Sequence, residues 1–169
     1  MTGVQTCALP ISGASARLTV ADVDPGRAQR AATELKAAVV APEDAYDVEA
    51  DVFSPNAAGG VVVDATLPRL RCRAVVGAAN EQLAEPRHGD ALHERGILYG
   101  PDYVVNAGGL LSLLYEKGEV DEDGVTRRVE QIGPRLSALW ARARAERVAP
   151  HRLADRMAEE RLAAARSRR

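Results

Sequence analysis

Short apolar segments alternate with helix signals along residues 17–103, and this alternation constrains the possible fold more than any other feature of the sequence. Each segment is bounded by glycine, proline or charged residues, which is the profile of a buried strand. Strands that alternate with helices in units of roughly 25 residues imply a parallel sheet with helices on both faces. We therefore expect an α/β fold with strands at residues 17–22, 38–40, 51–54, 74–77 and 97–99.

Helix boundaries are signalled between several of these strands. Asp24 is a good N-cap and Pro25 suits the first helical position. Alanines and Leu35 follow at helical spacing, which predicts a helix that runs to residue 38. Pro42 is expected to open a short helix, and residues 85–95 are expected to form another. These helices would connect consecutive parallel strands.

The pattern changes to helices alone after residue 103. Apolar residues at helical spacing predict helices over residues 104–116, 121–147 and 151–168, separated by Lys117-Gly118 and by Ala149-Pro150. Two apolar stripes are expected to pack in the core, namely Leu136, Leu139, Trp140 and Ala143, and then Leu153, Met157 and Leu162. His151 follows Pro150 at a helix start and is expected to be exposed.

Charge and cysteine content exclude several classes of function. A formal net charge of −2 and a pI of about 6.0 offer no global reason to bind nucleic acid. No run of about 18 uncharged apolar residues exists, so no contact with a membrane is expected. Cys7 and Cys72 cannot build a disulfide framework, which favours a cytoplasmic protein. Cys72 lies between two arginines, and we expect a half-buried structural thiol there rather than a reactive one.

The start of the chain differs in composition from the rest. Residues 1–11 hold no charged residue, whereas the chain is densely charged from Arg17 onward. They lack the basic start of a signal peptide. A DNA string that resembles a sequencing-library adapter encodes them in one reading frame. We therefore expect residues 1–11 to be an artefact joined to a longer frame, in which the protein begins upstream of Ser12.

Polar and small residues follow the predicted strands where the strands end. Asp22 ends the first strand, where dinucleotide-binding folds place an acid that accepts hydrogen bonds from both hydroxyls of the adenine ribose. A plain turn or N-cap role explains the same residue. Small or amide residues occupy 54–59, 77–80 and 106–109, which follow later strands. Because ligands of open α/β sheets bind at the carboxyl ends of strands, these segments are candidate contacts with a flat ring.

Acidic and histidine residues offer weak metal signals. A calcium-loop template is partly matched by Glu119, Asp121, Asp123, Gly124 and Glu130. Thr126 stands at a position that is usually apolar, and a helix that starts near Asp121 explains the same acids as N-cap and first-turn charges. His88 and His93 lack further ligands at zinc spacing. We therefore expect no bound metal.

Six segments carry a family resemblance in their order and spacing: ARLTVADVD, ADVFSPNAAGG, VVGAANEQL, RHGD, RGILYGPDYVVNAGG and ADRMAEERL. With them, residues 12–166 resemble the C-terminal NAD-binding domain of the Glu/Leu/Phe/Val dehydrogenase family. The resemblance implies a Rossmann-like parallel sheet lacking its first strand, followed by C-terminal helices. It implies a partial NAD-binding domain at 12–120 and helices at 121–169 that pack on it. It also implies NAD-dependent oxidative deamination of an L-amino acid to a 2-oxo acid and ammonia.

The resemblance further implies contacts with NAD at the strand ends. These contacts are Asp22, Val23, Arg27, Ala57, Ala58, Ala78, Ala79 and Asn80. The first three would surround the adenosine, the next two would line the cofactor cleft, and the last three would meet the nicotinamide. An acid at Asp22 favours NAD over NADP. The family often has Cys at the position of Asn56, where this sequence departs from it.

Substrate contacts are implied after the last strand. Asn106 would face the reacting centre. Leu113 occupies the position where glutamate-specific members carry a Ser, and Leu110 lies one turn earlier on the same helical face. Two leucines offer no partner to a buried carboxylate, whose desolvation costs several kcal/mol. The expected substrate is therefore leucine, valine or phenylalanine, or the matching 2-oxo acid.

Catalytic groups are not expected in this chain. The family's catalytic lysine and aspartate lie in an N-terminal domain, and neither Lys36 nor Lys117 lies in the corresponding motif. We expect the full-length protein to be a homo-oligomeric amino-acid dehydrogenase and the 169-residue chain to be inactive alone. The alternatives are a non-enzymatic nucleotide-binding or interaction module and a calcium-responsive helical module.

Overall fold

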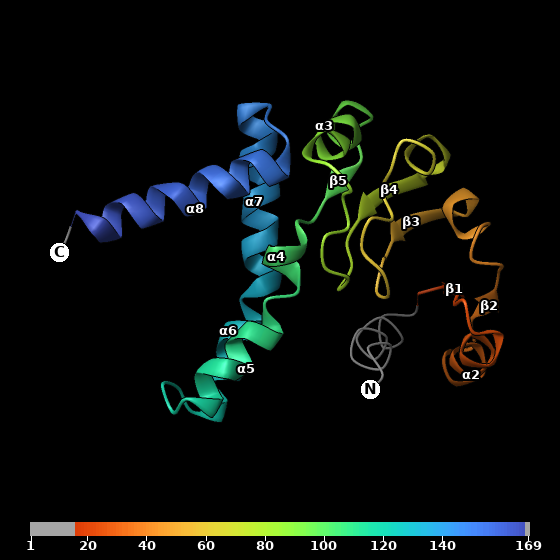
Figure 1. Ribbon diagram of the computed structural model, residues 1–169, viewed down its shortest axis with the longest axis horizontal. Coiled ribbons are helices and arrows are strands. Elements are labelled where there is room, and N and C mark those ends of the chain that lie inside the picture. Colours follow the sequence, from red (N-terminus) through yellow and green to blue (C-terminus); the bar gives the residue numbers. More distant parts are fainter. Residues whose placement is uncertain (1–15, 168–169) are drawn as a thin grey trace.

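The computed structural model describes residues 16–167, whose strands form two parallel groups (Figure 1). β1 (Thr19–Val20) pairs with β2 (Ala38–Val39), while β3 (Glu49–Phe53), β4 (Arg71–Val75) and β5 (Leu98–Tyr99) form a three-stranded sheet in that order. In a doubly wound sheet the strands lie in the order 3-2-1-4-5-6, so strand 1 stands between strands 2 and 4. Without strand 1, such a sheet consists of a pair (strands 2 and 3) and a triplet (strands 4, 5 and 6), as observed here. The predicted α/β fold is therefore confirmed. The artefact predicted at residues 1–11 lies outside the described residues.

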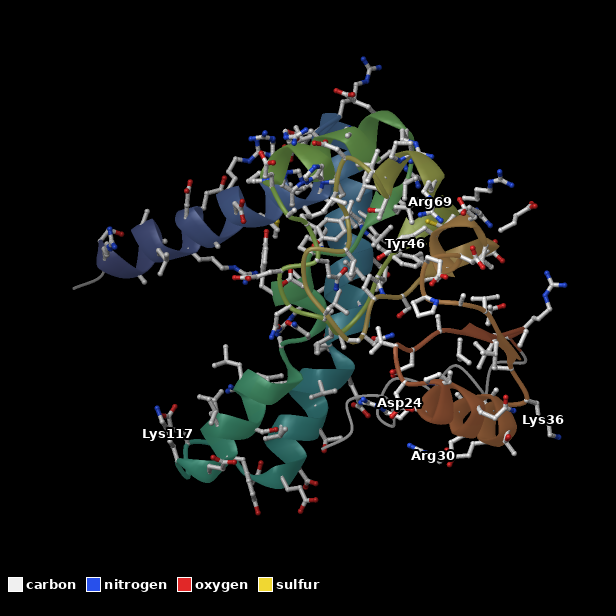
Figure 2. All side chains as sticks on the ribbon, turned by 45° about the vertical axis from the view of Figure 1, so that its right-hand side comes forward. Asp24, Arg30, Lys36, Tyr46, Arg69 and Lys117 are labelled. Atoms are coloured by element: carbon white, nitrogen blue, oxygen red, sulfur yellow. The ribbon has the colours of Figure 1, made fainter. Side chains whose placement is uncertain are left out.

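α2 (Pro25–Leu35) begins where the sequence predicts. Asp24 accepts hydrogen bonds from the backbone N–H groups of Gly26 and Arg27, at 2.8 and 3.1 Å, and Pro25 occupies the first turn. The helix ends at Leu35, before the expected residue 38, because Lys36 adopts a left-handed backbone with φ 54°. Figure 2 shows Asp24 and Lys36 at opposite ends of this helix.

A helical segment precedes each strand of the triplet. The 3-10 helices η1 (Ala45–Asp47) and η2 (Leu67–Arg69) precede β3 and β4, and α3 (Pro86–Glu94) precedes β5. The short helix expected at Pro42 thus begins later, at Ala45, whereas the helix expected over 85–95 is confirmed. Arg69 joins the two 3-10 helices, since its guanidinium lies 2.6 Å from Asp47 and 5.5 Å from the centre of the Tyr46 ring (Figure 2).

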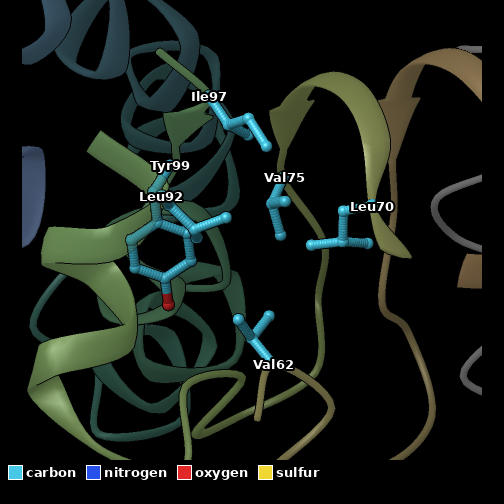
Figure 3. Close-up of a cluster of buried hydrophobic side chains, with 6 residues drawn as sticks. All are labelled: Val62, Leu70, Val75, Leu92, Ile97 and Tyr99. Atoms are coloured by element: carbon cyan, nitrogen blue, oxygen red, sulfur yellow. The ribbon is translucent and has the colours of Figure 1, made fainter. Parts of the chain in front are cut away.

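A first apolar core lies between the triplet and α3 (Figure 3). It consists of Val62, Leu70, Val75, Leu92, Ile97 and Tyr99. Val75 pairs with Phe53 on one side and with Tyr99 on the other, so the three strands end at a common edge. Complete burial of one large aliphatic side chain contributes about 1.5–3 kcal/mol. This core therefore holds the carboxyl ends of the strands in place.

Helices alone follow β5 in the described chain. They are α4 (Asp102–Val105), α5 (Gly108–Glu116), α6 (Glu122–Glu130), α7 (Ile132–Glu146) and α8 (Pro150–Arg166). A second core joins α7 and α8 and includes Leu136, Leu139, Ala143 and Leu153, with Trp140 and Met157 packed against it. Trp140 Nε1 donates to the Tyr99 carbonyl at 2.8 Å, which ties α7 to β5. Between residues 16 and 167, no helix is long and apolar enough to cross a membrane.

Several predictions for this helical part are corrected. Two helices replace the one expected over 104–116, because the backbone of Asn106 leaves the helical conformation, with φ −95° and ψ 21°, and so ends α4. Gln131 interrupts the helix expected over 121–147. His151 is buried rather than exposed, because α3 packs against α8 at this position. Leu162, expected in the core, is 59% exposed.

Candidate functional site

Asp22 lies two residues after the end of β1, and its side chain is 16% exposed. Its Oδ1 accepts a hydrogen bond from the Asp24 N–H at 2.8 Å, which closes the turn that leads into α2. Arg27 Nε lies 3.8 Å from the same oxygen, and Val23 is exposed beside it. No residue between 16 and 167 donates a hydrogen bond to Oδ2. One carboxylate oxygen therefore has a structural role, while the other can accept from a ligand.

Asn56 joins the end of β3 to the end of β4. Its Nδ2 donates to the carbonyl and hydroxyl oxygens of Ser54, at 2.9 and 3.0 Å, and its Oδ1 accepts from the Ala78 N–H at 2.9 Å. The Ala79 N–H donates to the Pro55 carbonyl at 3.0 Å. The segments 54–59 and 77–80, which the sequence places after separate strands, thus form one unit.

Two glycines permit the close crossing of these segments. A Cβ on Gly77 would lie 2.0 Å from the Pro55 carbonyl oxygen, and a Cβ on Gly59 would lie 2.6 Å from the Asn80 carbonyl oxygen. Side-chain atoms do not approach backbone atoms so closely, so only glycine is compatible with either contact. The small residues after the strands therefore bring the two loops together.

Asn106 brings the third predicted segment to the same edge of the sheet. Its Nδ2 donates to Asn80 Oδ1 and lies 3.5 Å from the Ala78 carbonyl oxygen. Asn106 lies in the break between α4 and α5, so the interruption of the helix places this amide next to the turn after β4. Polar side chains that follow β3, β4 and β5 thus gather at one place.

The other predicted residues differ in exposure. Ala57 and Ala58 are exposed, Ala78 is half-buried, and the Ala79 side chain is buried. On α5, Leu110 and Leu113 are 67% and 47% exposed. Within residues 16–167, no hydrogen bond or ion pair joins the turn at 22–24 to the segments 54–59 and 77–80. The structure therefore gathers the predicted nicotinamide contacts and leaves the predicted adenosine contacts as a separate group.

Gln82 belongs to this site and was missed by the sequence analysis. Its side chain is fully buried, and its Nε2 donates to the carbonyls of Gly77 and Ala79, at 2.7 and 3.0 Å. A glutamine in a loop is usually exposed, and neither periodicity nor charge marks this one as different. A buried side-chain amide becomes visible only when its partners are known.

Titratable groups near this edge have structural roles. Burial raises the pKa of Tyr99, whose hydroxyl donates to Asp102 at 3.2 Å. Burial also raises the pKa of the half-buried Cys72 thiol, as expected for a structural cysteine. In the described part of the chain, no three His, Cys, Asp or Glu side chains are grouped as metal ligands. Asp121 caps α6 by accepting from the Gly124 N–H at 2.7 Å, so the N-cap interpretation of this acid is confirmed.

Comparison with known proteins gives the family of this chain. The family model for Glutamate/Leucine/Phenylalanine/Valine dehydrogenase matches residues 14–169. Leucine dehydrogenase of Geobacillus stearothermophilus is 42% identical over 147 residues, which are 87% of this chain and 40% of that protein. L-tryptophan dehydrogenase of Nostoc punctiforme is 40% identical over 147 residues, which are 86% of this chain and 42% of that protein. The chain thus spans about 40% of the length of the curated relatives that it matches.

Solved structures share the fold. The crystal structure of L-tryptophan dehydrogenase from Nostoc punctiforme matches with a TM-score of 0.89 and 35% identity, covering 95% of this chain and 49% of that chain. The hetero-hexameric glutamate dehydrogenase from Thermus thermophilus, in a Leu bound form, matches with a TM-score of 0.64 over 92% of this chain and 50% of that chain. At 22% identity, this second match is a likeness of fold alone.

Proposed function

The chain belongs to the glutamate/leucine/phenylalanine/valine dehydrogenase family, and we propose that it is the NAD-binding part of an L-amino-acid dehydrogenase. The reaction is the oxidative deamination of an apolar L-amino acid to the 2-oxo acid and ammonia. The observation that carries this proposal is the convergence of Asn56, Asn80 and Asn106 from three strand ends. Ligands of open α/β sheets bind at this edge.

The donors and acceptors of this edge fit a nicotinamide dinucleotide. The hydroxyls of a ribose are donors, and Asp22 supplies a carboxylate acceptor of restricted exposure in the turn that follows β1. A carboxamide needs one donor and one acceptor, and the side-chain amide of Asn80 and the carbonyl of Ala78 offer both. Asn80 Oδ1 already accepts from Asn106, which leaves the amide hydrogens of Asn80 for a ligand.

Each predicted residue has a distinct task in this proposal. Asp22 binds the adenine ribose, with Val23 and Arg27 beside the adenine, and the exposed alanines at 57 and 58 line the cleft. Residues 78–80 hold the nicotinamide end, where the buried Ala79 acts through its backbone. NAD, when bound, supplies the hydride acceptor. The negative charge of Asp22 repels a ribose 2′-phosphate, so NAD is favoured over NADP.

The proposed substrate class is apolar. Asn106 faces the reacting centre, and Leu110 and Leu113 follow it as exposed residues on α5. An apolar surface disfavours a substrate carboxylate, because that charge would lose its hydration without gaining a partner. Leucine, valine and phenylalanine meet this requirement. The relatives named leucine, tryptophan and phenylalanine dehydrogenase support an apolar or aromatic substrate.

We further propose that this chain binds the cofactor without completing the reaction. Lys36 and Lys117 lie at the C-terminal ends of α2 and α5, and neither forms a hydrogen bond with Asn80 or Asn106 (Figure 2). The family resemblance assigns the catalytic lysine and aspartate to another domain. For the full-length protein we propose a cytoplasmic homo-oligomer.

Titration of the 169-residue chain with NADH, followed by nucleotide fluorescence, tests cofactor binding. We expect saturable binding by the unchanged chain and an affinity lower by about tenfold or more in Asp22→Ala, which loses the ribose acceptor. Asp123→Ala, which removes an acid from the first turn of α6, is the matched control and leaves the affinity unchanged. Failure of the unchanged chain to bind NADH would contradict the proposal.

A second assay tests the expected inactivity. The chain is incubated with NAD and leucine, valine or phenylalanine, and NADH formation is followed by absorbance. We expect no turnover, because the chain brings no lysine to the edge that holds Asn80 and Asn106. Measurable turnover would show that the catalytic groups lie within these 169 residues.

A further inference from the structure

We propose that Asn56 and Gln82 are positioning residues that hold the turn after β4 from two sides and thereby set how the nicotinamide end of the cofactor is bound. These two side chains are called the amide clamp below. The inference rests on the proposed function, since it concerns the same edge of the sheet. It assigns a role to two residues that are not themselves expected to touch the ligand.

Asn56 forms the first half of the amide clamp. Its Oδ1 accepts from the Ala78 N–H at 2.9 Å, while its Nδ2 donates to the carbonyl and hydroxyl oxygens of Ser54 at 2.9 and 3.0 Å. Both amide hydrogens and the carbonyl oxygen of the side chain are therefore engaged within the protein. Asn56 links the end of β3 to the turn after β4 and has no donor left for a ligand.

Gln82 forms the second half from inside the protein. Its side chain is fully buried, and its Nε2 donates to the carbonyls of Gly77 and Ala79 at 2.7 and 3.0 Å. Among residues 16–167, its Oε1 has no hydrogen-bond partner. The buried amide group of Gln82 donates to two carbonyls of one turn and so fixes their direction. A buried carbonyl left without a hydrogen-bond donor would be unfavourable.

The amide clamp decides which polar groups of the turn face the ligand. The carbonyls on either side of Ala78 point to Gln82, the Ala78 N–H points to Asn56, and the Ala79 N–H points to the Pro55 carbonyl at 3.0 Å. The Ala78 carbonyl remains, with Asn106 Nδ2 at 3.5 Å and the exposed Asn80 beside it. The clamp thus presents one carbonyl acceptor next to one amide donor, in a fixed geometry.

If Asn56 and Gln82 only stabilise the fold, their loss weakens the binding of every ligand, whereas loss of a positioning role weakens binding of the nicotinamide alone. Two ligands distinguish these cases. NADH contains the nicotinamide, whereas ADP-ribose shares only its adenosine, phosphates and ribose. The proposed adenosine contact, Asp22, lies in the turn between β1 and α2 and shares no hydrogen bond with the amide clamp in the described chain. Loss of the clamp therefore weakens NADH binding selectively, while general loss of structure weakens both ligands.

The experiment measures dissociation constants of the 169-residue chain for NADH and for ADP-ribose by calorimetry. In Asn56→Ala and in Gln82→Met, we expect the affinity for NADH to fall about tenfold relative to that for ADP-ribose. Asn56→Asp keeps an acceptor for the Ala78 N–H, so its affinity for NADH should lie between those of Asn56→Ala and the unchanged chain. Gln131→Met, at an exposed position between α6 and α7, is the matched control and changes neither constant.

A ligand-free measurement tests the clamp independently. Amide hydrogen exchange, followed by NMR, is expected to be at least about tenfold faster at Ala78 in Asn56→Ala and unchanged in α2. Unchanged exchange at Ala78, or equal losses of affinity for both ligands, would overturn the inference. If the unchanged chain binds neither ligand, the proposed function fails, and the exchange experiment alone decides whether the clamp exists. If Gln82→Met unfolds, the two Asn56 variants carry the test.

Discussion

The strand triplet and the strand pair differ in how firmly they are held. In the triplet and its covering helix, Val75, Leu92 and Tyr99 are at most 1% exposed. In the pair, Val39 is 44% exposed, and α2 buries only small alanine side chains. Because stabilisation increases with the apolar area removed from water, the triplet supports the turn at residues 77–80 more firmly than the pair supports Asp22. The proposed cofactor therefore binds across a strong and a weak part of the fold.

Removal of a core side chain from the triplet is expected to have the largest effect. Leu92→Ala leaves a cavity in a fully buried site and should lower the free energy of unfolding by about 2–5 kcal/mol. Leu162→Ala, at a position 59% exposed, is the control and should change it by less than about 0.5 kcal/mol. Urea denaturation followed by circular dichroism measures both. If both variants lowered the free energy of unfolding equally, the buried core could not be what makes the triplet firmer than the pair.

The contact between the triplet region and α8 is expected to depend on pH. Burial lowers the pKa of His151 below 6.5, although Asp90, with Oδ1 at 3.6 Å from Nε2, acts in the opposite direction. The unfolded chain therefore binds a proton that the folded chain excludes. As the pH falls below 6.5, the free energy of unfolding should decrease by up to about 1.4 kcal/mol per pH unit.

Urea denaturation across this pH range, in the unchanged chain and in His151→Gln, measures the contribution. The variant lacks the titrating ring, so its stability should vary less with pH below 6.5. His93→Gln changes a partly exposed histidine of α3 and serves as the control. If the free energy of unfolding of His151→Gln depended on pH as strongly as that of the unchanged chain, another group would be the cause.

Loss of a helix cap should act on the strand pair alone. Asp24→Ala removes the acceptor for the Gly26 and Arg27 N–H groups, so hydrogen exchange in α2 should accelerate about tenfold. Asp24→Asn retains an acceptor and should preserve most of the protection. Exchange in β4 should stay unchanged in both variants. Acceleration in β4 would show that the pair and the triplet open together.

The smallest effect is expected at the surface contact between η1 and η2, beside the triplet. Arg69 lies 2.6 Å from Asp47 and stacks over Tyr46, but both charged side chains are partly exposed. Solvent screens such a pair, so Arg69→Ala should shift the Tm by no more than about 2 °C. Thermal denaturation by circular dichroism measures the shift. A larger shift would mean that this partly exposed contact stabilises the triplet as a buried one would.

The local part of this architecture was predictable. All five strand segments overlap the expected ones, and Asp24, Pro25 and Asp121 occupy the expected capping positions. Strand and helix periodicity, together with caps, depend on residues close in sequence, so the pattern contains the necessary information. The same applies to the segments after the strands, whose Asn56, Asn80 and Asn106 were recognised as candidates.

Features that depend on distant residues were missed. Asn106 interrupts a segment of helical pattern, where its amide bonds Asn80, which lies 26 residues earlier. His151 is buried because Gly89 leaves space for its ring, since a Cβ there would lie 2.5 Å from Nδ1. No local pattern around either residue indicates these contacts.

By itself, the sequence determined the alternation of strands and helices, the helix caps and the set of strand-end residues from which a site is built. Only the tertiary structure decided that Asn56 and Gln82 bond the turn after β4, that Gly77 crosses Pro55, and that the Ala78 carbonyl lies beside Asn106. The reason is physical: a buried polar group must find a hydrogen-bond partner, and its possible partners are defined only when separate strand ends have been brought together.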